Sequence, residues 1–141
     1  MSSFTLSILL AVVACVIAGI IGGLTLARPQ PMLGVAGLGE DAEAATNIAT
    51  QGRAFGGMLV LAHGATALFL GYQPSVGAAM GFGLAMAWMG AAAGRAVALL
   101  TDRSRTPFNV GGLVFELLIG LTLALPFWNQ GRLTLSGGVM V

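Results

Sequence analysis

The stretch FTLSILLAVVACVIAGIIGGLTL, Phe4 to Leu26, decides the fold because it is a long apolar run without a charged side chain. A helix needs about 20 mostly apolar residues to cross the hydrocarbon core of a bilayer. This run is long enough, and Arg28 and Pro29 follow directly after it. Proline disfavours continuation of a helix. The stretch therefore predicts a first transmembrane helix over residues 4–26.

The composition of the whole chain also indicates an integral membrane protein. Of its 141 residues, 57% are hydrophobic and 8% are charged, whereas soluble domains carry about 25% charged residues. A soluble protein this apolar would lack the polar groups that cover a water-facing surface. The net charge of +1 gives no reason to expect nucleic acid as a partner.

Three further helices are predicted after the first. Residues 54–94 contain no Asp, Glu, Lys or Arg, and the segment GYQPS, Gly71 to Ser75, divides this run with a Gly and a Pro that are typical of a turn. The polar segment TDRSRTP, Thr101 to Pro107, precedes the last apolar run. We expect these helices over about residues 52–70, 76–100 and 107–128. The fold class predicted is a single all-α domain over residues 1–141, a four-helix transmembrane bundle with short loops and one longer polar loop after the first helix.

Two polar segments outside these runs have their own predictions. GLGEDAEAATNIATQ, residues 37–51, is expected to form a short surface helix from near Glu40, because Ala and Glu favour helix. The tail NQGRLTLSGGVMV, residues 129–141, is polar enough to leave the membrane.

Pro126 lies inside the last predicted helix and is expected to kink this helix or end it early.

The arginines predict the orientation in the membrane, since cytoplasmic loops carry an excess of basic residues. With four spans, Arg28, Arg53, Arg103 and Arg105 lie on one side and Arg132 on the other. We expect a multi-pass protein of the bacterial inner membrane with the Arg-bearing loops in the cytoplasm and both termini outside it.

Small residues at helical spacing predict where the helices approach one another, because close backbone contact drives helix association in lipid. Gly57 and Gly64 lie two turns apart in the second predicted helix, and Gly90 and Gly94 form a small-x-x-x-small pair in the third. The expected packing faces are Ala11, Cys15, Ala18 and Gly22 in the first helix and Gly83, Ala87, Gly90 and Gly94 in the third.

Charged groups inside membrane spans are costly and usually face the interior, where they pair. Glu116 lies roughly 13 Å from the start of the fourth predicted helix, and Arg95 about 9 Å from the same membrane side. The short loop between these helices makes them antiparallel neighbours. We therefore predict an Arg95–Glu116 ion pair, which Arg53 joins as a second donor. An arginine fork can bind a carboxylate at two places.

The fourth predicted helix has an inward face and a lipid-facing side. Asn109, Gly112, Glu116 and Gly120 recur at spacings of three and four, so they share the inward face. Val114, Leu118, Leu121 and Leu125 lie opposite. The cluster has two interpretations: an ion-pair clasp that fixes helix register, or a site that relays protons or binds anions. The few Ser, Thr and Asn residues within the spans favour the clasp.

His63 and Trp88 are candidates for contact with a ligand or pigment. His63 lies near mid-membrane and Trp88 in the middle of the third predicted helix. A bis-histidine haem needs two histidines and this chain has one. The alternative is a neutral histidine hydrogen-bonded to another helix, so we expect no cofactor, no metal and no catalytic residue.

Three segments resemble a bacterial family of small four-helix membrane proteins catalogued as a domain of unknown function. They are GRAFGGMLVLAHG (Gly52 to Gly64), GRAVALLTD (Gly94 to Asp102) and FELLIGLTLAL (Phe115 to Leu125). The similarity covers roughly residues 5 to 128. The resemblance singles out the residues that match the motifs of the family, which are Arg53, Gly56, Gly57, Gly94, Arg95 and Glu116. It implies no established activity. Many members carry an acidic residue shortly before the arginine that opens the second helix, where this chain has Gln51.

Taken together, these features predict a non-catalytic structural or accessory subunit that packs in or against a larger inner-membrane complex. The alternative is a small proton- or anion-coupled transporter or channel that uses Arg53, Arg95 and Glu116. The expected partners are membrane lipid and other integral membrane subunits or further copies of the chain itself.

Overall fold

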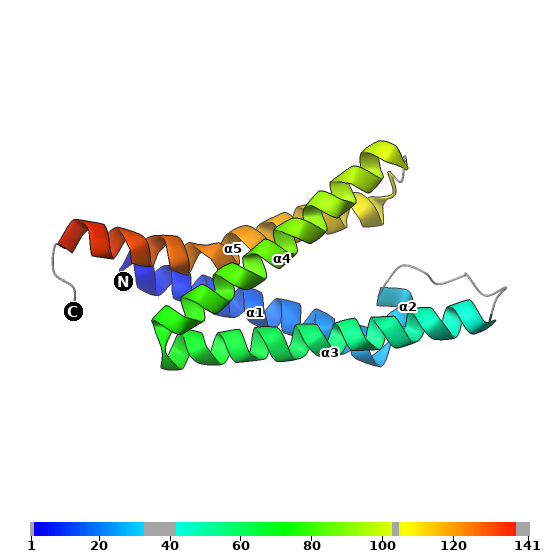
Figure 1. Ribbon diagram of the computed structural model, residues 1–141, viewed down its shortest axis with the longest axis horizontal. Helices are drawn as coiled ribbons and strands as arrows, with labels where there is room; N and C mark the ends of the chain where they lie inside the picture. The colour runs from blue at the N-terminus through cyan, green and yellow to red at the C-terminus, as the bar shows by residue number, and fades with distance from the viewer. Residues whose placement is uncertain (1, 33–41, 103–104, 138–141) are drawn as a thin grey trace. The chain divides into compact units, whose positions relative to one another are not determined.

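A computed structural model describes residues 2–32, 42–102 and 105–137, and within these ranges no residue lies in a β-strand (Figure 1). The helices are α1 (Ser3–Ala27), α2 (Pro29–Met32), α3 (Ala42–Tyr72), α4 (Pro74–Thr101) and α5 (Pro107–Gly137). All except the short α2 are long and apolar enough to cross a membrane. The predicted fold class, all-α with four long helices, is confirmed.

Two helix boundaries differ from the prediction. α3 begins at Ala42 rather than near Gly52, so residues 42–51 are not a separate surface helix. Ala and Glu favour helix and no proline interrupts the segment, so it continues directly into the apolar run. α5 continues through Pro126 to Gly137. Pro126 is fully buried, so packing around its ring stabilises the helix across the missing backbone donor.

The chain divides into two compact units, one of Met1–Cys15 with Thr66–Val141 and one of Val16–Ala65. The first unit contains α4, α5, the first turns of α1 and the last turns of α3. The second unit contains the rest of α1, α2 and most of α3. We describe each unit separately.

Small side chains dominate the core of the first unit. The buried residues that cluster there are Ala11, Ala14 and Cys15 of α1, Leu70 of α3, Ala85 of α4, and Ile119, Leu123 and Ala124 of α5. Two aromatic pairs border this core. The rings of Phe82 and Phe127 stack with centroids 4.6 Å apart, and Trp88 meets Phe115 edge to face at 5.7 Å. Trp88 therefore packs inside the chain, against α5.

Glycine is required where helix backbones touch. In the first unit, a Cβ on Gly77 of α4 would lie 2.5 Å from the Cα of Leu70 in α3. In the second unit, a Cβ on Gly56 of α3 would lie 2.5 Å from the backbone nitrogen of Leu26 and 2.6 Å from the carbonyl oxygen of Gly22 in α1. Any larger residue at these positions would move one backbone away from the other.

The predicted packing face of α1 is buried over its whole length, at Ala11, Cys15, Ala18 and Gly22. The structure gives α4 a different face from the predicted one. Gly83, Ala87, Gly90 and Gly94 are exposed, whereas the buried residues of α4 are Gly77, Ala78, Gly81, Ala85 and Ala92. Small residues occur on both sides of α4, so spacing alone did not distinguish the faces.

Other predicted packing glycines differ in their surroundings. At Gly64, as at Gly90 and Gly94, a Cβ would meet no described atom within 4 Å. At Gly57 it would only reach the Cδ1 atom of Leu26, at 4.0 Å. Gly120, in contrast, faces Met89 of α4, with Sδ at 3.1 Å from such a Cβ. Gly64, Gly90 and Gly94 therefore do not pack closely within the described part of the chain.

Candidate functional site: an ion-pair cluster between α4 and α5

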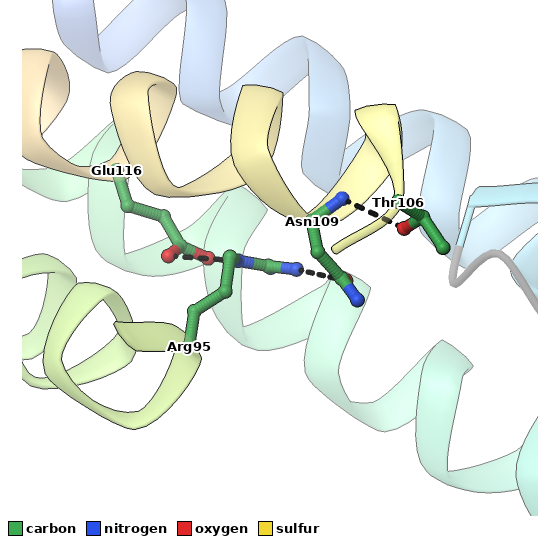
Figure 2. A network of polar contacts seen from close by, with 4 residues as sticks. All are labelled: Arg95, Thr106, Asn109 and Glu116. Atoms are coloured by element: carbon green, nitrogen blue, oxygen red, sulfur yellow. Dashed lines mark hydrogen bonds and ion pairs between the residues drawn. The ribbon is translucent and has the colours of Figure 1, made fainter. Parts of the chain in front are cut away.

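The cluster lies where α4 ends and α5 begins. α4 and α5 pack side by side in the first unit (Figure 1). The start of α5 has Pro107 at its first position, where a missing backbone donor costs nothing. Thr106 caps this start, since its Oγ1 accepts a hydrogen bond of 3.2 Å from the backbone N–H of Asn109. This cap orients the first turn of α5, from which Asn109 points toward α4 (Figure 2).

Arg95 of α4 and Glu116 of α5 form a two-pronged ion pair. The Nε of Arg95 donates to Oε2 of Glu116 at 3.0 Å, and its Nη2 donates to Oε1 at 2.7 Å. Both carboxylate oxygens are therefore bound by one guanidinium, the planar arrangement in which Arg–carboxylate pairs are strongest. The Glu116 side chain is 8% exposed and that of Arg95 is 26% exposed, so the carboxylate is the more deeply covered partner.

Two further residues of α5 hold the guanidinium. Nη1 of Arg95 donates to Oδ1 of Asn109 at 3.2 Å (Figure 2). The guanidinium carbon also lies 5.9 Å from the centre of the Phe108 ring, within the range of a cation–π contact. Arg95 thus contacts α5 over its first three turns. The arrangement ties the last turns of α4 to the first turns of α5.

Gly112 provides the space that the guanidinium occupies. A Cβ at this position would lie 2.8 Å from Cζ and 2.9 Å from Nε of Arg95. Gly112 lies between Asn109 and Glu116 on the same side of α5, so the arginine crosses the helix at this residue. The glycine is therefore part of the ion-pair cluster, which we define as Arg95, Asn109, Gly112 and Glu116.

We expect Gly112→Ala to destabilise the protein by about 1 to 2 kcal/mol, at the lower end of the cost of overpacking. The added methyl group displaces a guanidinium that its hydrogen bonds to α5 hold in place. The measurement is the free energy of unfolding in mixed micelles of mild detergent and SDS. Gly111→Ala is the matched control, because a Cβ there meets no described atom within 4 Å. Equal effects of the two substitutions would show that Gly112 is not needed for the cluster.

Arg53, the predicted third member, belongs to the second unit and is exposed on α3. Its partnership with Glu116 stays a prediction. Thr106 and Phe108 were missed as contributors to the cluster. The signal for Thr106 was present, because a threonine followed by proline is a typical helix start. Nothing in the sequence indicated the approach of Phe108 to Arg95.

His63 is buried in α3, and its Nδ1 hydrogen-bonds the carbonyl oxygen of Leu59 at 2.8 Å. This acceptor lies on the same helix, one turn earlier. Across residues 2–32, 42–102 and 105–137, no group of three or more His, Cys, Asp or Glu side chains is placed to hold a metal ion. A ligand-binding role for His63 and Trp88 stays a prediction.

Comparison with known proteins identifies one family model. The model described as "Domain of unknown function (DUF4345)" matches residues 5–126 of the chain. No curated protein matches. No solved structure matches either. The matched range contains the whole ion-pair cluster, the second and third apolar runs, and nearly all of the first and fourth.

Proposed function

Because the chain belongs to the DUF4345 family, whose function is unknown, we propose its role from the structure: a non-catalytic structural or accessory subunit of a larger bacterial inner-membrane complex. Its four long helices are apolar enough to cross a membrane.

The observation that carries the proposal is the closed hydrogen bonding of the ion-pair cluster. Both oxygens of Glu116 accept from Arg95, and a third donor of Arg95 is bound by Asn109. In the described part of the chain, no buried side-chain nitrogen or oxygen lacks a hydrogen-bond partner. These groups hold two neighbouring helices to each other, which supports a structural role for the charges.

The same residues would carry the alternative function, a small transporter or channel for protons or anions. The feature in its favour is the 26% exposure of the Arg95 side chain, which is more than that of its partner Glu116. A transport role requires the ion pair to separate during each cycle. The two functions therefore differ in whether Glu116 and Arg95 stay together.

The test is purification of the chain from its native membrane in a mild detergent, followed by a flux assay in vesicles. Stable co-purification with larger membrane subunits, with no proton or anion flux from the chain alone, is the expected result. The proposal would be contradicted by an oligomer of this chain alone that conducts protons or anions. In that case Glu116→Gln would abolish the flux, while circular dichroism would show that its helix content is unchanged. Arg105→Gln is the control variant, because Arg105 is exposed in the connecting loop.

The proposed orientation has its own prediction. In a Cys15→Ala background, a cysteine at Gln73, in the turn between α3 and α4, is expected to react with an impermeant maleimide added to intact spheroplasts. A cysteine at Asp102, at the end of α4, is expected to react only after lysis. Both positions are exposed, so the membrane alone distinguishes them. The reverse labelling pattern would place the termini in the cytoplasm.

A further inference from the structure

We draw no further inference here: the strongest candidate, the exposed stripe of small residues along α4 formed by Gly83, Ala87, Gly90 and Gly94, is an unpartnered helix face, and nothing in the structure shows what covers it.

Discussion

Glu116→Ala is expected to lower the free energy of unfolding by about 3 to 5 kcal/mol, the usual cost of removing one partner from a buried ion pair. The loss comes from the arginine that is left behind. Without the carboxylate, the Nε and Nη2 groups of Arg95 lose their acceptors. A positive charge at membrane depth that has lost its negative partner is costly. The measurement is unfolding of the purified protein in mixed micelles, followed by circular dichroism.

Val114→Ala is the matched control for this variant. Val114 lies two residues away on the same helix and is 52% exposed, so its truncation removes few contacts. We expect the control to change stability by less than about 1 kcal/mol, as for exposed sites in general. Similar losses in the two variants would mean that the ion pair contributes little to the fold.

Gly56→Ala is expected to lower the free energy of unfolding by about 1 to 3 kcal/mol, the usual cost of overpacking a well-packed site. The methyl group would meet backbone atoms of α1, the nitrogen of Leu26 and the carbonyl oxygen of Gly22. No side-chain rotation relieves such a contact, so the two helices must separate. Close approach is what stabilises helix pairs in lipid, and thermal unfolding in detergent measures its loss.

Gly64→Ala controls for the general effect of replacing glycine in α3. A Cβ at Gly64 meets no described atom within 4 Å. Alanine also has a higher helix propensity than glycine, by about 1 kcal/mol in water. We therefore expect Gly64→Ala to leave stability unchanged or slightly raised. A loss at Gly64 equal to that at Gly56 would contradict the assignment of Gly56 to the close approach of α1 and α3.

The number and type of the long helices could be predicted because each of them contains its own long apolar run. The ends were harder to place, since they depend on interactions outside those runs. Residues 42–51 are polar but have good helix propensity, so α3 starts before its apolar segment. Pro126 lies inside α5 because packing compensates for its local penalty. Composition alone does not reveal either effect.

The ion pair could be anticipated from depth and topology. Arg95 and Glu116 lie at similar depths from the same membrane side on consecutive antiparallel helices, so their side chains were expected to lie near one another. The packing face of α4 could not be predicted in this way. Gly81 and Ala85 have the same spacing as Gly83 and Ala87, yet only the first pair is buried. Which stripe faces inward is decided by the partner helices and not by the residues themselves.

The double variant Arg95→Met with Glu116→Leu tests most directly whether the cluster acts as a structural clasp. Replacing a buried ion pair by apolar side chains of similar volume removes both charges together, so neither is left without a partner. In mixed-micelle unfolding we predict that the double variant loses less stability than Glu116→Ala or Arg95→Met alone. A double variant as unstable as the sum of its two single variants would contradict the clasp.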